Sequence, residues 1–307
     1  MKSLRTMPLL PVLCRACWYA RLRWVRPLRR LASEFASNPR PPVPRVVLLE
    51  NRPLTESHVQ RISTDPAFNM VIDDLVAFTG MSRADVLTRV RRFPQFHHES
   101  EFRWCGPRDH GELAWFYRAA QSYLFSNAAH EYWRLLDILS ADLGRVLDYG
   151  AGIGNNALPL AKRGLDVDYL EISEIQSQFA RFRASRHGLS NMRFISPFVD
   201  GTFDPVGCIA DTYGAIVLQD VLEHVPNYDK LLSHLIGHLK PGGLIVETSP
   251  FCETAPAVAL HLPAAVPLEV AMVGMERIRE GVWRKAAPSS ASQHHAGATR
   301  VGTGQRG

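Results

Sequence analysis

The sequence has 307 residues, 46% hydrophobic and 21% charged, a composition that suits a globular protein with a sizeable core and excludes a largely disordered or fibrous chain. Its net charge of +5 is unevenly distributed, because residues 1–45 carry ten Lys or Arg and one acid, whereas the remainder carries 25 basic and 29 acidic residues. The folded part is therefore mildly acidic, and the overall charge says little about a site for phosphates or nucleic acid.

The first 45 residues form a basic arm in which arginines alternate with tryptophan, tyrosine and leucine. Residues 1–35 could lie on an anionic membrane surface or act as an organelle-targeting presequence. They could also include sequence upstream of a true start at Met7 rather than Met1. A poorly ordered extension is the simplest interpretation. The proline-rich residues 37–45 then form a stiff linker.

The cysteines are scattered and odd in number: Cys14, Cys17, Cys105, Cys208 and Cys252. They argue against a secreted disulfide framework, so we expect a cytoplasmic protein, with membrane contact only through the arm. Cys14 and Cys17 are spaced like half of a zinc site, but no second pair follows, and no metal site is expected. No run of residues approaches the roughly 20 apolar positions of a membrane-spanning helix.

Residues 54–142 are predicted to form a helical cap. A helix ends at Gly80, and Ser82 with Asp85 forms an S-x-x-D capping box that begins the next helix. Two short helices around a glycine also suggest a DNA-reading helix-turn-helix, but the second has apolar residues to bury and acids beside its arginines, which favours a cap. The aromatic-rich residues 112–142 are predicted to form a long helix or helix pair.

Between residues 143 and 287 strands alternate with helices. Predicted strands span 144–149, 166–171, 192–196, 214–219 and 243–249, and predicted helices span 154–163, 174–187 and 228–239. This alternation is typical of a doubly wound α/β fold, Rossmann-like, with a mostly parallel sheet. Residues 288–307 are of low complexity and are expected to form a disordered tail.

The letters VLDYGAGIGNNALPLAKRG, residues 146–164, join the first predicted strand to the first predicted helix of this region. Gly150, Gly152 and Gly154 fall where the chain turns at the carboxyl edge of the sheet, and their missing side chains should leave the backbone open to a ligand. A dinucleotide fingerprint would have its third glycine where this chain has Asn155. The G-x-G-x-G spacing after an acid instead resembles motif I of the class I S-adenosylmethionine-dependent methyltransferases.

A later block strengthens this resemblance. The letters YGAIVLQDVLEHVPNYDKLLSHLIGHLKPGGLIVETSP, residues 213–250, are similar to the family's fourth strand, the LEHV turn, the next helix and the LKPGG turn into the fifth strand. The resemblance covers residues 144–250 and is closest to the ubiquinone-biosynthesis O-methyltransferases and other small-molecule methyltransferases. Nucleic-acid amino-methyltransferases carry N/D-P-P-Y/F where this chain has QDVLEH, which argues against a nucleic-acid partner and for a small-molecule acceptor.

The resemblance implies S-adenosyl-L-methionine as the cofactor. Its methionine part would be lined by Gly150, Gly152 and Gly154, and Asp148 would order their turn.

Five further residues are implied as cofactor contacts. Glu171, at the tip of the second strand, would accept both ribose hydroxyls, and Ile172 would pack on the adenine. Gln219 and Asp220, at the end of strand four, would border the methyl group and the acceptor. Asp200 would accept from the adenine amino group.

Methyl transfer from a sulfonium is an in-line displacement that requires alignment and exclusion of water. If the acceptor is a hydroxyl, a base of near-neutral pKa helps, and His224 is the best-placed candidate for this catalytic role. The alternative is that Glu223 and His224 brace their loop, because this turn is common in the family across many acceptors. The helical region before Asp142, with Tyr117, Tyr123 and Tyr132, is expected to close over the pocket and shape the acceptor site.

The family's sheet normally ends with an antiparallel strand pair, which is hard to find in residues 271–287. We therefore expect an incomplete pair, which would leave the fifth strand as an exposed edge and open the acceptor pocket. Two functions follow: an active small-molecule methyltransferase, or a catalytically weak or inactive methyltransferase-like binding protein. The oligomeric state is not indicated by the sequence.

Overall fold

The computed structural model describes residues 64–92, 117–118, 123–129, 136–251, 261–262, 264 and 266–287. The predictions made for the basic arm and for the low-complexity tail lie outside these residues and stay predictions. None of the helices in the described ranges combines the length and the apolar character needed to cross a membrane.

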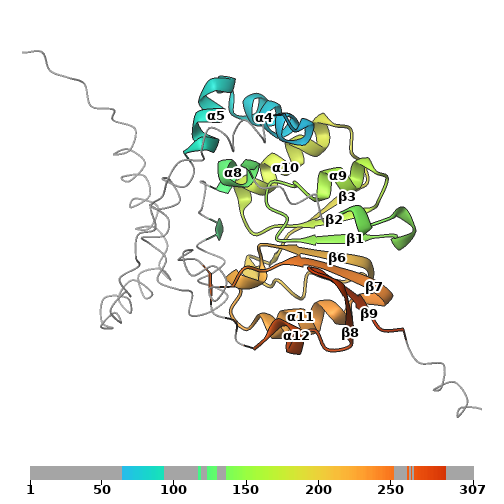
Figure 1. Ribbon diagram of the computed structural model, residues 1–307. Helices are drawn as coiled ribbons and strands as arrows, with labels where there is room; N and C mark the ends of the chain where they lie inside the picture. Colours follow the sequence, from blue (N-terminus) through green and yellow to red (C-terminus); the bar gives the residue numbers. More distant parts are fainter. Residues whose placement is uncertain are drawn as a thin grey trace, which may run out of the picture. The chain divides into compact units, whose positions relative to one another are not determined.

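A seven-stranded sheet forms the centre of the described chain (Figure 1). Its strands, in spatial order, are β3 (Met192–Ile195), β2 (Val167–Leu170), β1 (Val146–Tyr149), β6 (Tyr213–Gln219), β7 (Leu239–Thr248), β9 (Val282–Lys285) and β8 (Met275–Arg279). The first five pair in parallel, and β9 is antiparallel to both of its neighbours. The order reverses between β1 and β6, and in such sheets ligands bind at the reversal, outside the carboxyl ends of the strands.

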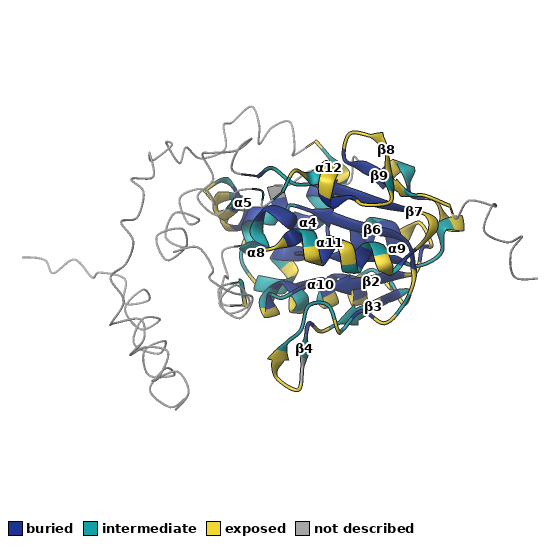
Figure 2. Ribbon diagram, turned by 90° about the horizontal axis from the view of Figure 1, so that it is seen from below, coloured by how far each residue is buried: buried dark blue, intermediate teal, exposed yellow. Residues whose placement is uncertain are grey.

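Helices cover both faces of the sheet, as the doubly wound prediction requires. α9 (Ala157–Lys162) and α10 (Glu174–Arg186) lie on one face, and α11 (Tyr228–Gly237) and α12 (Leu268–Ala271) on the other (Figure 1). Because both faces are covered, every residue of β1, β2 and β6 is buried (Figure 2). Alternate residues feed two cores: Val146 packs with α9 and α10, and Leu147 packs with α11.

The two helices predicted on either side of Gly80 are confirmed as α4 (Pro66–Thr79) and α5 (Arg83–Arg91). Gly80 ends α4 with a φ of 69°, and the Ser82 hydroxyl accepts the backbone N–H of Asp85 at 3.1 Å to begin α5. A third core joins α4 and α5 to α10 through Phe179.

The aromatic-rich segment, expected to be a long helix or a helix pair, is not one continuous helix in its described part. It contains α8 (Tyr123–Ser126) and the 3-10 turns η1 (Asn127–Ala129) and η3 (Ala141–Leu143). Gly144, with a φ of 75°, follows η3 and leads into β1.

The expectation of an incomplete C-terminal strand pair is wrong. β8 and β9 form an antiparallel hairpin, and β9 pairs with β7 over Val282, Trp283 and Arg284. The Trp283 indole N–H donates to Oε1 of Glu247 at 3.2 Å, and the Lys285 ammonium donates to two backbone carbonyls at the end of α11 and the start of β7. The fifth parallel strand is therefore covered, not an edge.

Candidate active site

The turn between β1 and α9 has three glycines in the left-handed region, with φ of 70° at Gly150, 53° at Gly152 and 80° at Gly154. Residues with a Cβ are strained at such angles, so the turn depends on glycine. The backbone N–H groups of Gly150 and Ala151 both donate to the carbonyl of Leu170, at 2.9 and 3.0 Å. These bonds hold the turn at the carboxyl ends of β1 and β2.

The positions that a Cβ would take at Gly150 and Gly152 are occupied by other parts of the protein. A Cβ on Gly150 would lie 2.6 Å from Cγ2 of Val221, and a Cβ on Gly152 would lie 2.8 Å from Nδ2 of Asn127. Glycine is required here by the backbone angle and by close packing.

Glu171 follows β2 and is 8% exposed. Its Oε2 accepts the N–H of Gly152 and its Oε1 accepts the N–H of Ser173, both at 2.7 Å. Burial raises the pKa of this carboxyl, and the backbone N–H groups of Ser173, Gly152 and Ile172 oppose that rise. The carboxylate therefore points at the glycine turn, and each oxygen keeps a lone pair for a hydroxyl donor.

Asp148 lies within β1, 1% exposed, and faces the start of α9. The backbone N–H of Ala157, the first residue of α9, donates to its carboxyl, and burial raises the pKa of that carboxyl to about 7. Its Oδ2 has no hydrogen-bond partner among the described residues. Asp148 thus links the strand to the helix that follows the glycine turn.

β6 is the neighbour of β1 at the strand-order reversal, and its carboxyl end lies beside the glycine turn. Gln219 is buried, and Asp220, with a φ of 52°, donates its N–H to the carbonyl of Thr248 at 2.8 Å. The next residue, Val221, packs against Gly150. The implied methyl-side residues and the implied methionine-side residues are therefore neighbours.

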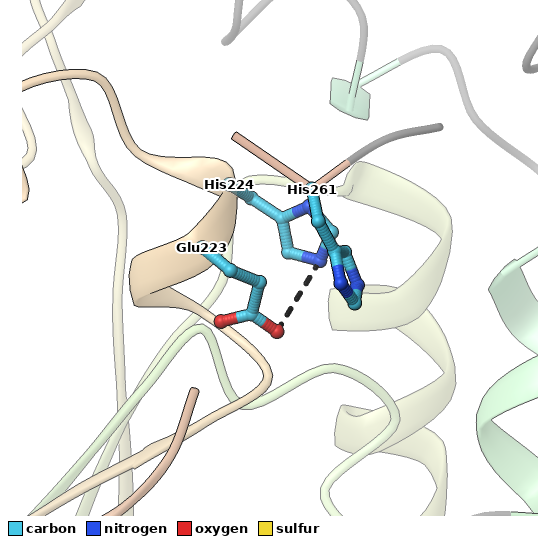
Figure 3. Close-up of side chains that lie close together, drawn as sticks. All are labelled: Glu223, His224 and His261. Atoms are coloured by element: carbon cyan, nitrogen blue, oxygen red, sulfur yellow. Dashed lines mark ion pairs between the residues drawn. The ribbon is translucent and has the colours of Figure 1, made fainter. Parts of the chain in front are cut away.

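Three side chains gather just beyond this point: Glu223, His224 and His261 (Figure 3). Glu223 and His224 belong to η4 (Leu222–His224), and the ligand atoms of all three lie within 4.8 Å of one another. Nε2 of His224 is 3.6 Å from Oε1 of Glu223, and the two imidazole rings meet edge to face at 5.0 Å.

The electrostatics of this cluster are dominated by burial. Glu223 is fully buried, and burial, with the nearby charge of Asp220, raises the pKa of its carboxyl to about 9. The pKa of His261 is lowered by burial, and the charge of Asp220 partly opposes this lowering. Asp220 is therefore close enough to act on both groups.

Tyr117 connects the cluster to Glu171. Its ring lies 5.7 Å from the His224 ring and 5.7 Å from the Tyr123 ring. Burial raises the pKa of the Tyr117 phenol, and both Glu223 and Glu171 add to the rise. One aromatic side chain thus lies near both carboxylates, and the expectation that it closes a pocket over them stays a prediction.

A family model described as a methyltransferase domain matches residues 120–281, more than half of the chain. The chain belongs to the class I S-adenosylmethionine-dependent methyltransferases. S-adenosylmethionine is the cofactor of this family.

Two curated methyltransferases illustrate the similarity. The sarcosine/dimethylglycine N-methyltransferase of Aphanothece halophytica is 36% identical over 34% of this chain and 38% of its own length. The ubiquinone biosynthesis O-methyltransferase of Rickettsia felis is 28% identical over 33% of this chain and 39% of its own length. The chain thus spans less than half of the length of either relative. Among solved structures, TehB from Haemophilus influenzae is 18% identical over 49% of this chain and 59% of its own, with a TM-score of 0.40.

The residues at the glycine turn fit the cofactor of a class I methyltransferase. Glu171 is a buried carboxylate that makes no ion pair within the described part of the chain, and donors on a vicinal diol would stabilise its charge. Ile172, beside it, is half-exposed and offers apolar surface next to that position.

One residue implied by the methyltransferase resemblance lies apart from this group. Asp200 is exposed, with a φ of 49°, at the tip of the small hairpin formed by β4 (Phe198–Val199) and β5 (Thr202–Phe203). This hairpin projects from the sheet (Figure 2). The structure gives Asp200 no contact with the glycine turn.

Sequence reasoning missed a fully buried arginine that supports the methyltransferase's glycine turn. Nη1 of Arg183 donates to the carbonyl of Ile153 at 2.7 Å and to Oδ1 of Asn155 at 3.1 Å, and its Nε donates to Oδ2 of Asp74 at 3.0 Å. The burial of Arg183 could have been predicted, because it lies four residues after Phe179 and therefore on the same, buried face of α10.

A second missed group braces the same turn. Nδ2 of Asn127 donates to Oε1 of Gln176 at 2.7 Å, and Nδ2 of Asn155 donates to the carbonyl of Asn127 at 2.7 Å. The hydroxyl of Tyr169 donates to the carbonyl of Gly152. These partners are 17 to 49 residues apart in sequence, so no local pattern announces them.

Proposed function

We propose that this chain transfers the methyl group of S-adenosylmethionine to a small-molecule acceptor. One observation carries the proposal: Glu171, buried at the tip of β2, accepts the N–H of Gly152 from within the glycine turn. This contact joins the two elements that would hold the ribose and the methionine part, and it lies at the strand-order reversal.

Each residue of the site has a role in this proposal. Glu171 accepts the ribose hydroxyls, and Ile172 packs on the adenine. Gly150 and Gly152 present backbone to the methionine part. Gln219 and Asp220, across the strand-order reversal, border the methyl group.

Bound S-adenosylmethionine supplies a methyl group on a positively charged sulfur, from which the methyl is displaced in line. The chain itself contributes alignment and the exclusion of water, which together can lower such a barrier by about 7 to 11 kcal/mol. Tyr117 would serve both purposes, because its hydroxyl is buried and its side chain lies near Glu171, Glu223 and the ring of His224. The acceptor would lie between this cluster and the end of β6.

The alternative function, an inactive binding protein, was based on a sheet without its last strand pair. The β8–β9 hairpin removes that basis, since the sheet is closed on the β7 side. The active enzyme is therefore the better-supported function.

Titration calorimetry with S-adenosylmethionine tests the proposal. Glu171→Ala should weaken binding at least tenfold, because hydrogen bonds to a charged acceptor contribute about 1.5 to 3 kcal/mol each. Glu174→Ala is the matched control, because Glu174 is an exposed carboxylate three residues later whose contacts are a 3.8 Å ion pair with Arg118 and a 3.5 Å hydrogen bond from Gln178. Its affinity should stay within about twofold of the parent chain.

Absence of binding heat and of a melting shift with millimolar S-adenosylmethionine would contradict both the cofactor assignment and the enzyme. If the cofactor binds, transfer of a labelled methyl group to a panel of small molecules identifies the acceptor. Equal weakening by both variants would show that Glu171 has no special place in the site.

A further inference from the structure

The Glu223–His224–His261 cluster has the donor set of a metal site. Two imidazole nitrogens and one carboxylate oxygen lie within 4.8 Å of one another, and the closest pair, His224 Nε2 and Glu223 Oε1, is 3.6 Å apart (Figure 3). Ligands bound to zinc at 2.0–2.1 Å stand about 3.4 Å from each other. Small side-chain rotations would therefore bring all three onto one cation.

A second observation comes from Glu223 alone. Its side chain is 0% exposed, and neither carboxylate oxygen has a hydrogen-bond partner among the described residues. Buried carboxylates are normally hydrogen-bonded, paired with charge or bound to a metal. The long contact to His224 does not satisfy either oxygen by hydrogen bonding.

A backbone hydrogen bond joins the two segments that supply the ligands, η4 with Glu223 and His224 and the segment with His261. The N–H of Leu262, next to His261, donates to the carbonyl of Glu223 at 2.7 Å. Asp220 lies three residues before Glu223, in a left-handed conformation, and its charge acts on both Glu223 and His261. A negative residue beside the cluster favours a cation over a neutral ligand.

We propose that Glu223, His224 and His261 bind a divalent transition-metal ion, for which Zn²⁺ is the reference. Two histidines and one glutamate are a common zinc set that leaves a coordination position open, and imidazole ligands select such ions over Mg²⁺. The sequence predicted no metal site, because His261 lies 37 residues after His224 and belongs to no recognisable spacing.

This inference rests on the proposed function and specifies its acceptor as a hydroxyl. A cation at the open position would hold the acceptor hydroxyl and lower its pKa, so that its proton passes to water. The oxygen lone pair then forms the bond to the methyl carbon, and the electrons of the carbon–sulfur bond return to sulfur. His224 acts as a ligand in this scheme rather than as the free base expected from the sequence.

Metal binding is measured directly on the full chain after dialysis against a chelator. We expect one Zn²⁺ per chain by elemental analysis and calorimetry, and ligand-field absorption with Co²⁺. Glu223→Gln and, separately, His261→Ala should weaken Zn²⁺ binding about 100-fold or more. The control is the double variant His294→Ala/His295→Ala, which removes the neighbouring histidines of the tail and should bind Zn²⁺ like the parent.

The outcomes separate this inference from the proposed function. Unchanged Zn²⁺ affinity in both cluster variants, or loss of binding in the tail variant, would overturn the metal site. If S-adenosylmethionine binds and methyl transfer survives full removal of metal, His224 acts as a base and the inference fails while the proposed function stands. If Zn²⁺ binds at the cluster but S-adenosylmethionine does not bind, the proposed function fails and the metal site stands.

Discussion

Asp148 is buried in β1 with one unpartnered oxygen, and its pKa of about 7 lies well above the usual value for an aspartate. A folded-state pKa above the unfolded one means that the folded chain binds the extra proton. The contribution of Asp148 to stability is therefore full below about pH 4 and is lost as the pH rises to about 7. The loss is on the order of 1 kcal/mol per pH unit in this window.

The prediction is tested by urea unfolding of the parent and of Asp148→Asn at several pH values. The difference in free energy of unfolding, parent minus variant, should fall from pH 4 to pH 7 and then level off, because asparagine does not titrate. Asp137→Asn is the matched control: Asp137 is exposed, and its hydrogen bond to Arg279 lowers its pKa. Its difference should stay flat over the same range, and a flat line for Asp148→Asn would show that Asp148 is ionised in the folded chain.

Single residues could be predicted where one segment carries the signal. Gly150 and Glu171 were assigned from a turn and a strand tip, and both lie where those local patterns placed them. The cluster partner His261 was not found, because its approach to Glu223 depends on a backbone bond between distant segments. Asp200 stays an untested prediction, and the structure places it at the tip of the β4–β5 hairpin, which counting from strand three could not reveal.

At the scale of elements, α4 is joined to α10 by a buried ion pair between Asp74 and Arg183, each about 1% exposed. Asp74→Ala would leave the Arg183 charge buried without its partner, and such a loss costs about 3 to 5 kcal/mol. The neighbouring Asp73 offers a matched control, because its ion pair with Arg83 is exposed. Asp73→Ala should change the free energy of unfolding by no more than about 0.5 kcal/mol.

Urea unfolding of the two variants checks this prediction, and calorimetry with S-adenosylmethionine extends it. Arg183 also donates to the carbonyl of Ile153 in the glycine turn, so Asp74→Ala should weaken cofactor binding as well. Equal stability of the two variants would mean that the cap is not held by this pair.

Helices and parallel strands were predicted from periodicity because each buries a continuous apolar face. The β8–β9 hairpin was missed for a physical reason. Four of the five residues of β8 are exposed, so the strand has no apolar alternation, and its existence depends on pairing with β9. β9 in turn depends on the edge of β7, a partner more than thirty residues away.

At the scale of the whole molecule, the β8–β9 hairpin covers the edge of β7 and completes the sheet. Two truncated chains test how much the sheet depends on this hairpin. A chain ending at Gly274 lacks β8 and β9, exposes the edge of β7 and loses the burial of Val282 and Trp283. Removal of a buried tryptophan alone costs about 3 to 5 kcal/mol, a large part of the 5 to 15 kcal/mol typical of a domain. We expect this chain to be insoluble or to lack a cooperative melting transition by circular dichroism, because an unpaired strand edge also promotes aggregation.

The matched control ends at Ala287, after β9, and removes only residues beyond the described part of the chain. Its melting temperature should equal that of the parent, since the Trp283 bond to Glu247 and both bonds from Lys285 remain. If the chain ending at Gly274 melted like the control, the five parallel strands would be stable alone. The hairpin could then not be the reason to prefer an active enzyme over a binding protein with an open pocket, and the choice between them would depend on catalysis alone.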